Sequence, residues 1–245
     1  MPTILLRAEP GDRPPEVLLV EEPQTAERAA GLLDGGPDGS VLIGTHRGLA
    51  AFRGRWQGHP VTIQTTGLGA PSMAMVVEEL LMTGARRLVR VATAMAVAPW
   101  MRLGETIVVL AAAPADGASR TYLGGLPMAP IADFGVTDAL VREARAAGID
   151  VSVGGVATVD VLPDRARLTE LAARGILAAD LGTAPLFVLA ARAAAGERPA
   201  GGHIRAAAIL WIDQLAPDDE PPAGDALPDR LLRVALDALT ATPDP

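Results

Sequence analysis

Arg90 and Thr93 stand out because they interrupt an apolar run, "LVRVATA" (88–94), that otherwise predicts a buried strand. Burying a guanidinium is costly unless an anion meets it, so Arg90 must face a negatively charged group. A nearby hydroxyl could serve the same anion. Two simpler interpretations stay open, a snorkelling arginine for Arg90 and a capping hydroxyl for Thr93.

The segment "TTGLGAPS" (65–72) places two glycines between a predicted strand and a predicted helix. Such a turn exposes backbone N–H groups at a helix N-terminus, which suits an anion. Taken alone, the segment is better explained as a tight strand-to-helix turn with no ligand, so it identifies no function by itself.

Composition excludes several kinds of chemistry. The 245 residues include no cysteine and no lysine, which excludes disulfides, thiolate nucleophiles, Schiff bases and the lysine of a P-loop. The three histidines have no metal-ligand spacing, so no metal site is expected. The net charge of −8 argues against a nucleic-acid partner. No apolar run has the length of a membrane span and no signal peptide is recognised, so we expect a cytoplasmic protein without a membrane partner.

The elements that must position these residues alternate between strands and helices. Strands are predicted at 16–20, within 40–67 (with a hairpin turn at 56–60), as two strands within 86–109, and at 150–160 and 204–213. Helices are predicted at 25–35, 72–85, 136–149, 165–175, 184–196 and 228–240. The alternation predicts an α/β fold with a central sheet covered on both faces. No linker divides residues 1–245, so we expect a single domain.

The order of motifs in residues 62–160 resembles the nucleoside phosphorylase family, which includes purine nucleoside and uridine phosphorylases. Its members have a Gly-x-Gly-x-Pro-Ser turn, a helix rich in Glu-Glu-Leu, and an arginine followed by a hydroxyl residue at a strand end. "GLGAPS", "VVEELL" and "RVAT" stand in that order here, and "ADGASRTYLGG" (115–125) is similar to the uridine phosphorylase segment. The resemblance implies a mixed, twisted, distorted barrel-like sheet flanked by helices, and assembly as a homodimer or a hexamer built as a trimer of dimers.

The resemblance also implies a reaction, the phosphorolytic cleavage of the N-glycosidic bond of a purine or pyrimidine nucleoside. The products are a free base and (deoxy)ribose 1-phosphate; inorganic phosphate is a co-substrate and no cofactor is needed. Arg90 and Thr93 match the residues that bind phosphate, and Arg47 resembles an arginine lent to the neighbouring subunit's phosphate. A solvated surface arginine remains the alternative for Arg47.

Other positions match residues of the family that contact the nucleoside. Asp213 lies where purine-specific members have the aspartate that protonates the leaving base, a role that requires a pKa raised by burial. A carboxylate that caps a turn is the alternative. Ala94 and Met95 match the base-side Thr-Gly, and "DLG" (Asp180, Leu181, Gly182) matches the sugar-binding Glu-Met-Glu. Arg165 or Arg167 matches the pyrimidine-binding arginine, with a solvated helix arginine as the alternative.

The sequence departs from the family pattern at several of these sites. Glu21 and Thr25 replace the glycine and the arginine of a phosphate loop, and Gly182 replaces the second sugar-binding glutamate. Ala92 replaces the glycine after the strand arginine, and the N-terminal histidine is absent. Because each charge-assisted hydrogen bond is worth about 1.5–3 kcal/mol, the loss of several together would remove most of the family's ordinary activity. Three hypotheses follow: a divergent phosphorylase, a non-catalytic homologue that serves as a structural or regulatory subunit or small-ligand binder, and an enzyme with changed sugar specificity.

Overall fold

The computed structural model describes residues 2–195, 204–215 and 227–241. Within them the chain forms a single mixed sheet. Its strands are β1 (Glu16–Val20), β2 (Val41–Gly44), β3 (Ala51–Trp56), β4 (His59–Thr65), β5 (Arg87–Ala96), β6 (Thr106–Pro114), β7 (Val151–Thr158), β8 (Ala178–Asp180) and β9 (Arg205–Gln214). They lie in the order β2-β3-β4-β1-β5-β8-β7-β6-β9.

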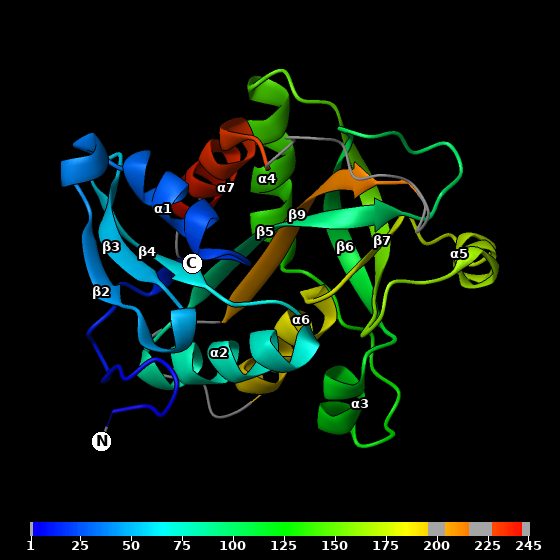
Figure 1. Ribbon diagram of the computed structural model, residues 1–245, viewed down its shortest axis with the longest axis horizontal. Helices are drawn as coiled ribbons and strands as arrows, with labels where there is room; N and C mark the ends of the chain where they lie inside the picture. Colours follow the sequence, from blue (N-terminus) through cyan, green and yellow to red (C-terminus); the bar gives the residue numbers. More distant parts are fainter. Residues whose placement is uncertain (1, 196–203, 216–226, 242–245) are drawn as a thin grey trace.

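An extra pairing closes part of this sheet. β5 pairs with β8 and also runs parallel to β9, so β5, β8, β7, β6 and β9 form a ring. β1, β4, β3 and β2 extend outward from β5 (Figure 1). The predicted barrel-like sheet is therefore confirmed. In the β5–β9 register Thr93 lies opposite Trp211, and the register shifts between Ala94 and Met95.

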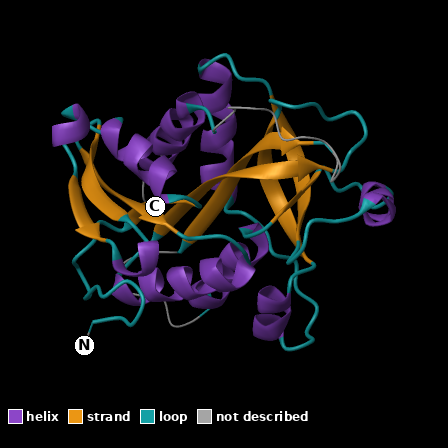
Figure 2. Cartoon of the chain, viewed as in Figure 1, coloured by secondary structure: helices purple, strands orange, loops and turns teal. Residues whose placement is uncertain are grey.

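Helices cover both faces of the sheet (Figure 2). They are α1 (Pro23–Gly31), α2 (Ala70–Thr83), α3 (Gly117–Leu123), α4 (Phe134–Ala146), α5 (Arg165–Ala172), α6 (Thr183–Ala194) and α7 (Asp229–Ala241), with short 3₁₀ turns at Gly36–Asp38 and His46–Gly48. α2 and α6 pack beneath the sheet in the view of Figure 1, whereas α1, α4 and α7 pack above it. Each face buries its own apolar core. No helix in the described ranges is long and apolar enough to cross a membrane.

The glycine turn begins α2 by backbone geometry. Gly67 and Gly69 have φ of 71° and 86°, values that L-residues with a side chain adopt only with strain. Ser72 Oγ donates a 2.6 Å hydrogen bond back to the carbonyl of Thr66. These contacts account for the two glycines as a tight strand-to-helix turn.

Candidate functional site

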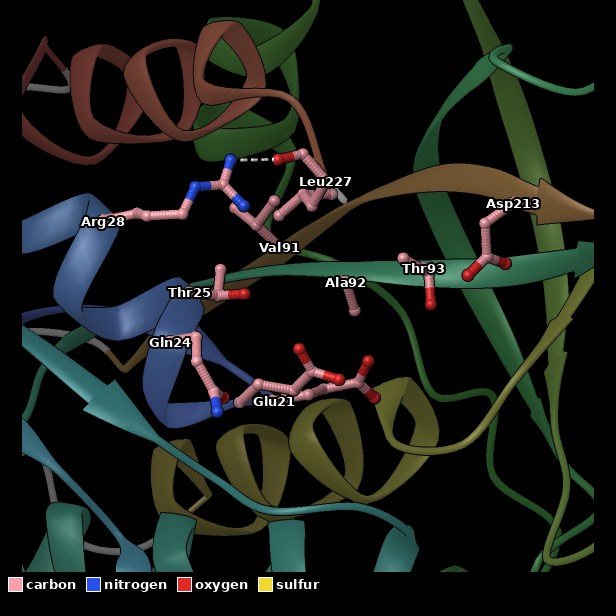
Figure 3. Close-up of a pocket in the computed structure, with 10 residues that line it drawn as sticks. Glu21, Gln24, Thr25, Arg28, Val91, Ala92, Thr93, Asp213 and Leu227 are labelled. Atoms are coloured by element: carbon pink, nitrogen blue, oxygen red, sulfur yellow. Dashed lines mark hydrogen bonds between the residues drawn. The ribbon is translucent and has the colours of Figure 1, made fainter. Parts of the chain in front are cut away.

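A cavity of about 330 Å³ opens where α1 begins, beside the central strand β5. Its walls come from the residues at and just before the start of α1, the middle of β5, the end of β9 and Leu227 ahead of α7 (Figure 3). The lining residues are Glu21, Glu22, Gln24, Thr25, Arg28, Val91, Ala92, Thr93, Asp213 and Leu227. The cavity therefore gathers segments that lie far apart in the sequence.

Arg90 forms ion pairs with two carboxylates of the protein itself, Glu21 and Asp180. Its Nη2 lies 2.8 Å from Glu21 Oε1 and 3.3 Å from Asp180 Oδ2, and its side chain is 1% exposed. Burial alone would lower the pKa of this guanidinium, but the two carboxylates outweigh burial and raise the pKa. Arg90 is not among the residues that line the cavity. Its phosphate-binding role stays a prediction. In this structure the guanidinium that would bind phosphate is paired with two carboxylates instead.

Asp180 is a fully engaged internal carboxylate. Its Oδ1 accepts a 2.6 Å hydrogen bond from the Thr158 hydroxyl, and its Oδ2 accepts bonds from the backbone N–H of Gly182 and from both the N–H and the hydroxyl of Thr183. It thereby caps the start of α6 and anchors Arg90. These contacts describe a structural carboxylate; the predicted contact with a nucleoside is untested.

Gly182 lies directly against the guanidinium of Arg90. A Cβ added at this position would come within 3.1 Å of Arg90 Cζ and 3.2 Å of both its terminal nitrogens. The φ of Gly182 is −155°, which any residue can adopt, so the constraint is space and not backbone conformation. The absence of a side chain at Gly182 therefore leaves the space that the Arg90 guanidinium occupies.

Glu21 is the charged group that separates Arg90 from the cavity. It follows β1, its side chain is 12% exposed, and it lines the cavity. One oxygen, Oε1, is held by Arg90, and within the described residues Oε2 has no hydrogen-bonding partner. The surface that a ligand meets here is therefore a carboxylate.

Asp213 and Thr93 lie side by side on adjacent strands and point into the cavity (Figure 3). Partial burial raises the pKa of the Asp213 carboxyl, and the negative charges of Glu21 and Glu22 raise it further, whereas the Thr93 hydroxyl acts in the opposite direction. A carboxyl whose pKa is raised can carry a proton into the cavity. This environment is the one that a general acid requires.

Arg28 closes the upper side of the cavity in Figure 3 and is itself paired. Its Nε and Nη2 donate to Asp229 Oδ1 at 3.1 and 2.5 Å, and Nη2 also donates to the carbonyl of Leu227. Sequence reasoning missed Arg28, Glu22 and Gln24. Glu22 and Gln24 lie within the recognised loop between Glu21 and Thr25 but match none of its functional positions, and the helical spacing of four between Gln24 and Arg28 does not distinguish a cavity wall from a solvated face.

The remaining predicted residues lie elsewhere. Ala94 and Met95 are buried in the core, and Leu181 packs against a small apolar cluster beside β7 and β8. Arg165 and Arg167 are exposed on α5, where Arg167 pairs with Glu170 at 2.7 Å. None of these five lines the cavity.

Arg47 is exposed in the 3₁₀ turn after β2, with a φ of 57°, and does not line this chain's cavity. The prediction that it reaches a neighbouring subunit stays open. The glycine turn likewise lies outside the cavity; Gly69 instead borders a second, mostly apolar hollow of about 710 Å³ with Met75 and Tyr122. No cluster of metal-ligating side chains occurs in the described part of the chain.

Comparison with known proteins identifies the scaffold that carries this cavity. The family model described as "Phosphorylase superfamily" matches residues 17–234. A purine nucleoside phosphorylase DeoD-type from Jannaschia sp. (strain CCS1) is 33% identical over 225 residues, covering 90% of this chain and 91% of the relative. One from Roseobacter denitrificans (strain ATCC 33942 / OCh 114) is 31% identical and covers 98% of this chain and 100% of the relative.

The predicted likeness to both branches is found as well. A uridine phosphorylase from Escherichia coli (strain K12) is 34% identical over 139 residues, which cover 57% of this chain and 53% of the relative. The closed sheet, the ordered motifs and these matches lead to one conclusion: the chain belongs to the phosphorylase superfamily, as a member of its nucleoside phosphorylase family.

Proposed function

We propose that this protein cleaves the N-glycosidic bond of a nucleoside and that Asp213 protonates the departing base. The observation that carries the proposal is the raised pKa of a carboxyl that points into a cavity, next to a hydroxyl on the neighbouring strand. Base departure leaves negative charge on a ring nitrogen, and a proton delivered there lowers the barrier. The similarity to purine nucleoside phosphorylases supports a purine as the base.

Phosphorolysis is the form of this reaction that the sequence predicts, with phosphate held by Arg90, Thr93 and Arg47. The cavity offers phosphate the start of α1, whose N-terminus favours anions, and the hydroxyls of Thr25 and Thr93. To bind phosphate directly, Arg90 would have to release Glu21. Phosphorolysis therefore requires a rearrangement of the ion pair that the structure contains.

The test is base release. Adenosine, inosine, guanosine and uridine, with their 2′-deoxy forms, are incubated with the purified protein with and without phosphate, and the free base is measured by liquid chromatography. We expect release from at least one purine nucleoside. A correctly folded protein that releases no base from any of them, under either condition, would contradict the proposal.

A non-catalytic homologue is the second candidate, and the closed Arg90 ion pairs favour it. In that case the scaffold would serve as a structural or regulatory subunit. Isolation from its native cells separates the two candidates: a stable complex with a second phosphorylase that retains an unpaired phosphate arginine, together with no activity of this chain alone, supports the subunit role.

A further inference from the structure

The charge around the cavity is unfavourable for a dianion. Arg90 is opposed by Glu21 and Asp180, and Arg28 by Asp229, while Glu22 faces the cavity without an ion pair in the described residues. The arginines are thus outnumbered by carboxylates before Asp213 is considered. A partial positive charge at the N-terminus of α1 offsets only about half of one charge.

The position next to Arg90 is already filled by an anion that is part of the chain. Glu21 reaches the guanidinium from the cavity side, while Gly182 lets the guanidinium lie against the backbone behind it. Asp180 holds Arg90 from β8 and is itself fixed by hydrogen bonds at the start of α6. The site is built to keep Glu21 in place.

We propose that the acceptor of the glycosyl group in this protein is water, bound and deprotonated by Glu21, and not phosphate. This inference rests on the proposed function, since it names the second substrate of the same bond cleavage. Oε1 of Glu21 stays on Arg90, which fixes the carboxylate, and Oε2 is the acceptor available to a water in the cavity. The cavity volume of about 330 Å³ is large enough to hold a water molecule as well as other ligand groups.

The step balances with water as the only co-reactant. The water oxygen forms a bond to C1′ of the pentose as the C1′–N bond breaks, and the bonding pair stays on the base nitrogen. Protonated Asp213 gives its proton to the base, and Glu21 takes a proton from the attacking water. The two carboxyls then exchange protons with solvent. A paired acid and base of this kind is how carboxylates cleave glycosidic bonds with oxocarbenium character.

The fate of the sugar decides the question without any substitution. Wild-type protein is freed of phosphate by dialysis and assayed with purine nucleosides, and the products are measured as free base, reducing pentose and pentose 1-phosphate. We expect base and free pentose in equal amounts, at a rate that added phosphate does not increase. With methanol present, methyl pentoside should form, because a neutral alcohol can replace water.

Two results would overturn parts of the scheme separately. Base release that depends on phosphate and yields pentose 1-phosphate refutes water as the acceptor and leaves the proposed function standing. An absence of base release in folded protein defeats the proposed function itself, and the inference with it.

Variants then test Glu21 as the base. Glu21→Gln keeps the size of the side chain and should reduce the turnover number about 10²–10⁴-fold, with circular dichroism unchanged. Glu27→Gln, at an exposed position of the following helix α1, is the matched control and should keep wild-type turnover. Glu21→Gly leaves space beside Arg90 and should gain phosphate-dependent formation of pentose 1-phosphate. Full hydrolytic turnover in Glu21→Gln would refute the role of Glu21.

Discussion

Arg90 is a buried guanidinium that is held between two carboxylates of its own chain. Its place in an apolar run correctly requires an anionic partner, because an isolated buried guanidinium is too costly. The sequence could not identify that partner, since Glu21 and Asp180 lie 69 and 90 residues away. Family resemblance predicts phosphate as the partner of Arg90, whereas the structure pairs Arg90 with two carboxylates of the same chain.

Substituting Gly182 tests how tightly Arg90 is housed. In Gly182→Ala the new Cβ would lie 3.1–3.2 Å from the guanidinium, which is fixed by its ion pairs. Overpacking of this kind should lower the free energy of unfolding by about 1–3 kcal/mol, measured by urea denaturation.

Gly31→Ala is the control for this prediction. Nothing lies within 4 Å of an added Cβ there, at the end of α1, so its stability should equal or exceed that of the wild type. If Gly182→Ala is as stable as Gly31→Ala, the guanidinium is free to move and the packing argument is wrong.

Asp213→Asn should separate activity from stability. Base release should decrease about 10²–10⁴-fold because the proton donor is lost. The raised pKa means that ionising Asp213 is less favourable in the folded than in the unfolded chain, whose value is near the ordinary 3.8. The contribution of Asp213 to wild-type stability is therefore greatest below that value and is lost as the pH rises through the folded-state pKa.

The asparagine variant lacks this decrease. Denaturation curves between about pH 4 and pH 8 should show Asp213→Asn gaining stability relative to the wild type as the pH rises. The opposite trend, with the wild type gaining on the variant toward neutral pH, would mean that the folded protein favours the ionised carboxylate, and the general-acid role would lose its support.

Whole elements were the most predictable part of the fold. α2, α4, α6 and α7 are long enough to show helical periodicity, and each lies within a few residues of its predicted range. β8 and α3 were not predicted as separate elements because three and seven residues carry too little pattern. The closing pair β5–β9 joins strands more than a hundred residues apart, so no local signal could indicate it.

The α2 turn gives a prediction at this scale. Gly67 has a φ of 71°, and an added Cβ would lie 2.7 Å from Ser72 Oγ. Gly67→Ala should lower the free energy of unfolding by about 1–2 kcal/mol for the backbone conformation alone. Repeating the substitution in a Ser72→Ala background removes the close contact, so a smaller loss there measures the steric part, and an equal loss assigns the whole effect to the backbone.

At the scale of the molecule, the N-terminal segment is fastened to α2 by one carboxylate. Glu79 accepts hydrogen bonds from the backbone N–H groups of Ile4, Leu5 and Leu6 at 2.7–3.1 Å. Burial alone would raise the pKa of Glu79, but these bonds outweigh burial and lower it. The stabilisation is therefore present above the ordinary value of 4.5 and is lost as the pH falls through the lower folded-state pKa.

Hydrogen exchange can measure this fastening. Glu79→Gln should lower the protection of the amides of Ile4, Leu5 and Leu6, measured relative to the intrinsic exchange rate at the same pH, near neutral pH. Wild-type protein should lose the same protection only in acid. Exchange that is unchanged by the substitution would show that other contacts hold the segment. The assembly into dimers or hexamers stays a prediction from family resemblance.

The pairing of Arg28 with Leu227 and Asp229 has a consequence for biosynthesis. The cavity wall beside α1 is completed only when the segment at α7 docks onto it. A nascent chain that has made β1, α1 and β5 but not yet β9 and Leu227 lacks two walls of the cavity.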